Sequence, residues 1–169
     1  MTLLLLLLSL SLVSCGSNES IYGSYSYIDT SSPIGPLIEF DIYSDSKSTK
    51  IVSGIVQLGE ISPEKQKDYA EIRKSIGTSS RNGSWSYEGS KLSIYSEKDD
   101  EKNLDYSFEI ERIKRHSITT KVVYVGEHLP EKILLGKEIT FDVGRSKDGK
   151  TPIHIHKNNS NRSPLQFWH

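Results

Sequence analysis

Two histidines separated by one residue, His154 and His156, are the side chains of this 169-residue chain best suited to hold a metal ion. Residues two apart on a β-strand share one face, so the imidazoles would stand together, with Thr140, Asp142 and His169 as conceivable further ligands. A zinc site needs a defined third ligand, whereas histidines on an outer strand face need only water. We therefore predict that these histidines are solvated and that the chain binds no metal.

The residues around the histidines predict a hairpin whose turn is Asp148 and Gly149. Apolar residues alternate along both of its arms and should point toward the core. They are Ile139, Phe141 and Val143 on the first arm and Ile153 and Ile155 on the second. The histidines would then lie on the outer face.

Other chemical groups form no recognisable constellation. The acidic residues Asp99, Asp100 and Glu101 lack the alternating ligands, the glycine turn and the closing acid of a calcium loop. No serine, histidine and acid stand in a nucleophile motif. We predict no cofactor and no enzymatic activity.

Cys15 is the single cysteine of the chain. Disulfides, thiolate zinc sites and cysteine catalysis are therefore excluded from the rest of the sequence. The 21 Lys and Arg residues are interspersed with 22 Asp and Glu residues and give a net charge of −1. Because no basic stripe forms, nucleic acid is not expected as a partner.

The N-terminal residues have the pattern of an exported protein. An apolar, leucine-rich run covers residues 3–13, is too short to span a bilayer and ends in the small residues of a processing site. We interpret residues 1–14 as a signal peptide.

Residues 12–15, Leu-Val-Ser-Cys, resemble the lipobox of bacterial lipoproteins. The resemblance implies that Cys15 becomes the mature N-terminus and carries acyl chains on its sulfur and its amine. Several acyl chains would anchor the protein to a membrane almost permanently, since each buried methylene contributes about 0.8 kcal/mol. Gly16 follows in place of the aspartate that marks inner-membrane retention, so the resemblance implies the bacterial outer membrane. Residues 15–20 would be the lipidated cysteine and a polar tether.

Residues 21–169 contain enough chain for one domain with a sizeable interior. The clearest element is a hairpin over residues 83–95, in which Trp85 and Tyr87 alternate with serines on one arm and Leu92 and Ile94 alternate on the other. Similar alternation predicts strands in many other parts of the domain. The clearest of these strands cover residues 21–27, 38–43, 51–58, 104–111, 118–125 and 139–143. In residues 104–111 the inward row would be Leu104, Tyr106, Phe108 and Ile110.

One helix is predicted between Ser62 and Gly77. Serine at the cap, proline at the first helical position and glycine after the end are start and stop signals. Tyr69, Ile72 and Ile76 recur at helical spacing, so this apolar stripe should cover one end or side of the sheet. The fold class is therefore mainly β, an antiparallel barrel or sandwich of about eight to ten strands with one short helix.

Several short motifs, taken in order, resemble the lipocalin-like domains of bacterial cell-envelope lipoproteins. They lie at residues 23–25 (Gly-Ser-Tyr), 83–85 (Gly-Ser-Trp), 89–94 (Gly-Ser-Lys-Leu-Ser-Ile) and 106–110 (Tyr-Ser-Phe-Glu-Ile). The resemblance implies a barrel that binds a small apolar ligand. Its cavity would be lined by Tyr25, Phe40, Trp85, Tyr106 and Phe108. The alternative is a structural or surface-interaction lipoprotein whose core is filled by side chains.

Overall fold

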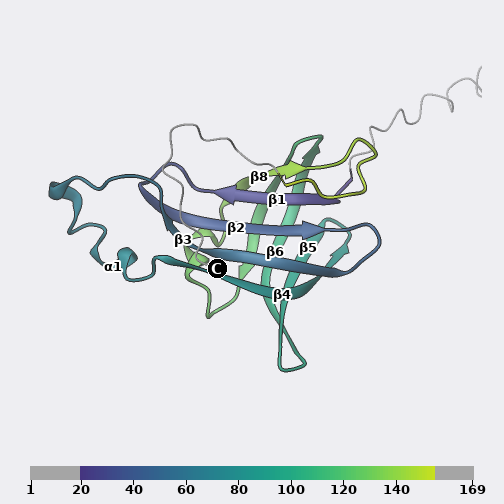
Figure 1. The fold of residues 1–169 in the computed structure, drawn as a ribbon, viewed down its shortest axis with the longest axis horizontal. Coiled ribbons are helices and arrows are strands. Elements are labelled where there is room, and N and C mark those ends of the chain that lie inside the picture. The colour runs from purple at the N-terminus through teal and green to yellow at the C-terminus, as the bar shows by residue number, and fades with distance from the viewer. Residues whose placement is uncertain (1–19, 155–169) are drawn as a thin grey trace, which may run out of the picture.

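The computed structural model describes residues 20–154 as a closed barrel of eight antiparallel strands, which confirms the predicted fold class. Each strand pairs with the next along the chain, and β8 returns to pair with β1 through Ser24–Gly144, Tyr25–Val143 and Ser26–Asp142 (Figure 1). The strands are β1 (Gly23–Ile28), β2 (Ile34–Ile42), β3 (Ser48–Gln57), β4 (Gly77–Glu88), β5 (Lys91–Lys98), β6 (Glu101–Lys114), β7 (Ser117–Val125) and β8 (Glu138–Gly144).

The barrel has two rims, because successive strands run in opposite directions. The N-terminal rim is the one where β1 begins and where the turns β2–β3, β4–β5 and β6–β7 lie. The η2 rim is the opposite one, named after the short 3-10 helix η2 (Pro130–Leu134) between β7 and β8. η2 contacts β2, β3 and β7, and it buries Leu134 against the barrel.

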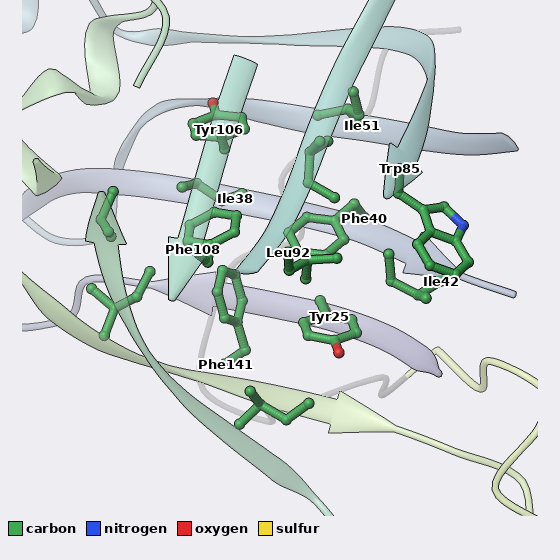
Figure 2. Packing of buried hydrophobic residues seen from close by; sticks show 14 of the residues in the cluster. Tyr25, Ile38, Phe40, Ile42, Ile51, Trp85, Leu92, Tyr106, Phe108 and Phe141 are labelled. Atoms are coloured by element: carbon green, nitrogen blue, oxygen red, sulfur yellow. The ribbon is translucent and has the colours of Figure 1, made fainter. Parts of the chain in front are cut away.

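Alternating apolar residues of the strands point into the barrel and form one core (Figure 2). Aromatic rings fill its centre: Tyr25 stacks on Phe40 with ring centroids 4.7 Å apart, and Phe141 meets Phe108 edge to face at 5.2 Å. The inward row Ile38, Phe40 and Ile42 is at most 2% exposed. An eight-stranded barrel is just wide enough for side chains to fill its interior, and these rings pack together at its centre.

The hairpin predicted over residues 83–95 is present as β4 and β5. Its turn includes Gly89, whose φ of 61° is in the left-handed region that favours glycine. Trp85 is 4% exposed and points inward, as the alternation predicts.

The predicted helix between Ser62 and Gly77 is much shorter than expected, and it does not pack on the sheet. The segment contains only the 3-10 turn η1 (Pro63–Lys65) and the four-residue α1 (Ala70–Arg73), neither of which buries a residue. Its apolar stripe does not close the barrel, since Ile76 is 40% exposed. Figure 1 shows α1 standing away from the strands. A short helix is marginal without tertiary packing, and the closed barrel leaves no apolar face for this one to cover.

The predicted last hairpin is only partly present. Its turn forms at Asp148 and Gly149, where Ser146 N donates to the carbonyl oxygen of Thr151. Its first arm is β8, but residues 145–154 form no second strand, and Ile153 is 50% exposed instead of inward. The physical reason is closure: β8 pairs with β7 on one edge and with β1 on the other, so no further strand can add to it. Ile155, His156 and His169 lie outside the described residues.

Substitution of two isoleucines tests which apolar side chains belong to the core. Ile118→Ala removes a fully buried side chain from β7 and should lower the free energy of unfolding by about 2–5 kcal/mol. Ile76→Ala, from the predicted helical stripe, should cost less than about 1 kcal/mol. Urea unfolding followed by circular dichroism measures both. Equal costs would contradict the assignment of the stripe to the surface.

Candidate functional site

All five residues predicted to line a ligand cavity lie in the core. Tyr25, Tyr106 and Phe108 are fully buried, and Phe40 and Trp85 are at most 4% exposed. Four of the rings form one connected group with Phe40 and Phe108 at its centre: Tyr25 stacks on Phe40 at 4.7 Å, Phe40 stacks on Phe108 at 6.0 Å, and Tyr106 stacks on Phe108 at 5.8 Å. These aromatic side chains therefore pack mainly against other side chains of the core.

Trp85 closes the core at the N-terminal rim. Its indole Nε1 donates a hydrogen bond to the carbonyl oxygen of Ser46 at 3.0 Å, and the Lys47 ammonium lies 3.5 Å from the ring centroid. Tyr22 meets the same ring edge to face at 6.3 Å. A turn, a cation and a second ring thus hold the indole in place.

Tyr25 lies close to the same rim and satisfies its hydroxyl locally. The hydroxyl donates a hydrogen bond to the carbonyl oxygen of Ile21. Burial raises the pKa of Tyr25 well above its ordinary value, so the hydroxyl remains a donor at neutral pH.

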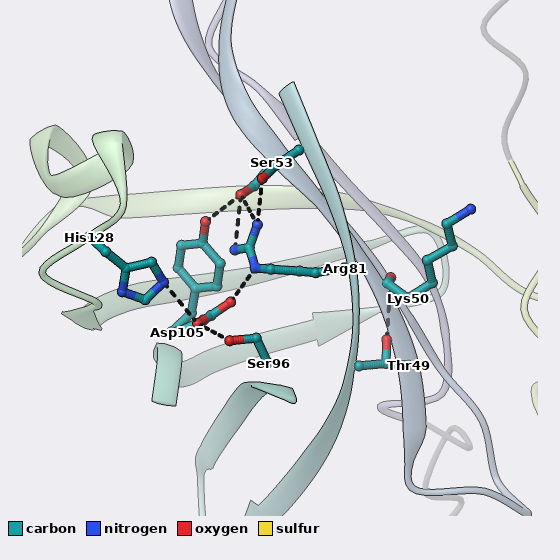
Figure 3. Close-up of polar contacts among 9 residues, drawn as sticks. Thr49, Lys50, Ser53, Arg81, Ser96, Asp105 and His128 are labelled. Atoms are coloured by element: carbon teal, nitrogen blue, oxygen red, sulfur yellow. Dashed lines mark hydrogen bonds and ion pairs between the residues drawn. The ribbon is translucent and has the colours of Figure 1, made fainter. Parts of the chain in front are cut away.

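A polar cluster occupies the interior near the η2 rim (Figure 3). Its centre is Asp105, which accepts hydrogen bonds from Arg81 Nε at 2.6 Å and from the Ser96 hydroxyl at 2.8 Å. Arg81 also donates through both terminal nitrogens to Ser53 Oγ, each at 3.2 Å. The Tyr106 hydroxyl donates to the same oxygen at 2.8 Å. The cluster links β3, β4, β5 and β6 across the barrel.

A β-bulge brings Asp105 into this cluster. Ile94 pairs with Tyr106 and Tyr95 pairs with Leu104, so Asp105 is the extra residue on β6. The prediction that Leu104 belongs to the inward row is therefore wrong, because the bulge shifts the alternation by one residue. Asp105, expected on the outer face, is fully buried.

The ionisable groups of the cluster and its neighbours shift one another's pKa. Burial alone lowers the pKa of Arg81, but the hydrogen bond and the charge of Asp105 outweigh burial and raise it. Burial, and after it the charge of Glu131, raises the pKa of Tyr106. His128 is more than half exposed and brings its Nε2 within 3.5 Å of Asp105 Oδ1. The Arg81 guanidinium therefore stays charged and the Tyr106 hydroxyl stays protonated at neutral pH.

Glu131 of η2 is the least satisfied member of this region. It is fully buried, yet neither carboxylate oxygen accepts a hydrogen bond from residues 20–154. Alternation could have revealed Arg81, which shares a strand face with Gly83 and Trp85. Nothing in the sequence marks Glu131, because a 3-10 turn lacks a long apolar period.

Ser24, Asp41 and His154 come together at the N-terminal rim. Ser24 Oγ lies 3.1 Å from His154 Nδ1, and His154 Nε2 lies 3.7 Å from Asp41 Oδ2. The second distance exceeds a hydrogen bond, so the carboxylate does not fix the ring as a catalytic triad requires. The imidazole side chain is 69% exposed, as predicted for a solvated histidine.

Two hollows open to solvent near the two rims of the barrel. One, of about 430 Å³, is formed by the charged β5–β6 turn and Asn82. The other, of about 500 Å³, is formed by Tyr87 and residues 110–114. None of the five aromatic residues predicted to line a cavity belongs to either hollow. Within residues 20–154, no three acidic or histidine side chains are grouped for a metal ion.

Comparison of the chain with protein-family models, with curated proteins and with solved structures finds no match. Among residues 20–154 there is no helix with the length and apolarity needed to span a bilayer.

The Arg81–Asp105 pair provides a double-mutant test of the cluster. Arg81→Met leaves a fully buried carboxylate without its cation and should cost about 3–5 kcal/mol of stability. Combining it with Asp105→Leu should cost much less than the sum of the single changes, because no uncompensated charge remains.

The exposed pair Lys74–Glu71 is the control, and Lys74→Met should cost less than about 1 kcal/mol. All variants are compared by urea unfolding. Strict additivity of the Arg81 and Asp105 changes would contradict their direct coupling.

Proposed function

We propose that this chain is a lipid-anchored lipoprotein of the bacterial cell envelope, placed at the outer membrane, whose filled barrel is a rigid scaffold for contacts on its outer surface. The observation that carries the scaffold part is the packing of the core. Tyr25, Phe40, Phe108 and Phe141 touch one another through centroid distances of 4.7–6.0 Å.

This packing favours the alternative of a filled core over an apolar ligand inside the barrel. A ligand site of ordinary size occupies several hundred cubic ångströms and is lined by apolar groups. The two hollows described above are of that size, but polar and charged residues contribute to both, and only the second borders the core, through Tyr87, Ile110 and Ile113. Binding of a small apolar ligand remains the second hypothesis, carried by the resemblance of the strand motifs.

The anchor part of the proposal rests on the lipobox, and Cys15 lies outside the described residues. The fold supports it in one respect. β1 begins at Gly23, only eight residues after Cys15, so an acylated Cys15 would hold the N-terminal rim close to the bilayer. A closed barrel with its core inside residues 20–154 needs nothing from the anchor to be complete.

Replacement of Cys15 tests the anchor. In bacteria, the wild-type chain should fractionate with the membranes, and its mature N-terminal peptide should carry acyl chains by mass spectrometry. Cys15→Ala should abolish acylation, because neither thioether nor processed cysteine amine can form. A wild-type protein found soluble and unacylated would overturn the anchor proposal.

A further inference from the structure

The two rims of the barrel differ in charge. At the N-terminal rim, residues 43–47, 88–91, 111–116 and 145–154 carry eight Lys and Arg against four Asp and Glu. At the η2 rim, residues 29–33, 58–76, 97–102 and 126–137 carry eight Lys and Arg against eleven Asp and Glu. The near-neutral chain is therefore a dipole with its positive end where β1 begins.

Hydrogen bonds join the basic segments into one surface. Arg145 Nε donates to the carbonyl oxygen of Tyr22 at 2.8 Å, and Arg145 Nη1 donates to those of Lys114 and Arg115 at 3.0 and 3.2 Å. One guanidinium thus ties the entry of the chain, the β6–β7 turn and the segment after β8 together. In Figure 1 the start of β1 and the segment after β8 lie on the same side of the barrel, opposite α1.

The charges of this surface are available to a partner. The side chains of Lys114, Arg115 and Lys147 are exposed, and none of them makes an ion pair with another residue among 20–154. Ile153, half exposed, stands in the same segment as Lys147. Exposed basic side chains and an exposed aliphatic residue on one rim match a bilayer surface, with charge for the headgroups and an apolar group for the layer below.

The length of the tether between Cys15 and β1 determines which partner this surface can reach. Tyr22 is the seventh residue after Cys15, so a fully extended tether would span at most about 25 Å. The N-terminal rim cannot leave the neighbourhood of the membrane that holds the acyl chains. The η2 rim lies beyond it by the length of the strands, roughly 30 Å for a ten-residue strand.

We propose that the N-terminal rim is a docking surface for an anionic phospholipid bilayer, and that it orients the barrel with its η2 rim pointing away from the membrane. This inference rests on the proposed lipid anchor. Each Lys or Arg close to an anionic surface strengthens binding about five-fold. Three such side chains change the ratio of docked to undocked protein about a hundredfold.

The test uses the acylated protein, extracted from membranes and placed in vesicles of phosphatidylcholine with or without phosphatidylglycerol. Because Cys15 is the single cysteine and would be acylated, an added cysteine is the one thiol open to a fluorophore. Ser44→Cys labels the N-terminal rim and Thr30→Cys labels the η2 rim; both positions are exposed. Lipids carrying a nitroxide on the headgroup report how close each fluorophore lies to the bilayer.

We expect strong quenching at Ser44→Cys on the anionic vesicles, weak quenching on the neutral vesicles, and its loss at high salt. Thr30→Cys should be unquenched on both. Adding Lys114→Glu, Arg115→Glu and Lys147→Glu should reduce the docked-to-undocked ratio at least a hundredfold. The matched control, Lys65→Glu with Lys67→Glu and Lys98→Glu at the η2 rim, makes the same change in net charge and should leave quenching unaltered.

Equal quenching of Ser44→Cys on the two kinds of vesicle, or quenching that survives the charge reversal at the N-terminal rim, would overturn the docking proposal. If the anchor proposal is wrong, the same experiment gives a different result. In that case Cys15 reacts with the fluorophore in the chain without an added cysteine, and the protein does not float with neutral vesicles.

Discussion

The pairing of β8 with β1 is the constraint on which the rest of the structure depends. Closure gives every strand two neighbours and fixes the volume inside, where the rings around Phe40 and Phe108 pack together. Closure also explains why two segments of the chain lie outside the barrel. With no free sheet edge, the segment after β8 cannot add a strand, and with no open apolar face, the segment around α1 has nothing to cover. Both segments therefore lie on the surface.

Inside the barrel the polar residues gather near the η2 rim, where Asp105, Arg81, Ser53 and Tyr106 satisfy one another. Taking the carboxylate of Asp105 out of water is costly, and its two close donors offset that cost. Glu131 has no such partners within the described residues, so η2 contributes apolar contact through Leu134 together with an uncompensated polar group. We infer that the η2 rim is less strongly stabilised than the aromatic centre of the core.

Local alternation was enough to predict the class of fold, the hairpin of β4 and β5, and the inward positions of Tyr25, Phe40, Trp85, Tyr106 and Phe108. It failed where a long-range contact decides the outcome. The bulge that turns Asp105 inward depends on the partner strand β5, and the exposure of Ile153 depends on β1 occupying the edge of β8. The helical pattern of Tyr69, Ile72 and Ile76 is a local signal without a surface to pack on. The polar cluster was missed because its members come from four different strands and meet only once these strands have paired.

We propose that the barrel is a filled scaffold, with its contacts made outside. Energy transfer to an apolar fluorescent probe tests it most directly, because Trp85 lies at the edge of the core and Trp168→Phe leaves it as the single tryptophan. In a folded sample the account predicts no saturable transfer as the probe is titrated. Saturable transfer at one probe per chain, displaced by a second apolar compound, would contradict it and establish a ligand cavity inside the barrel.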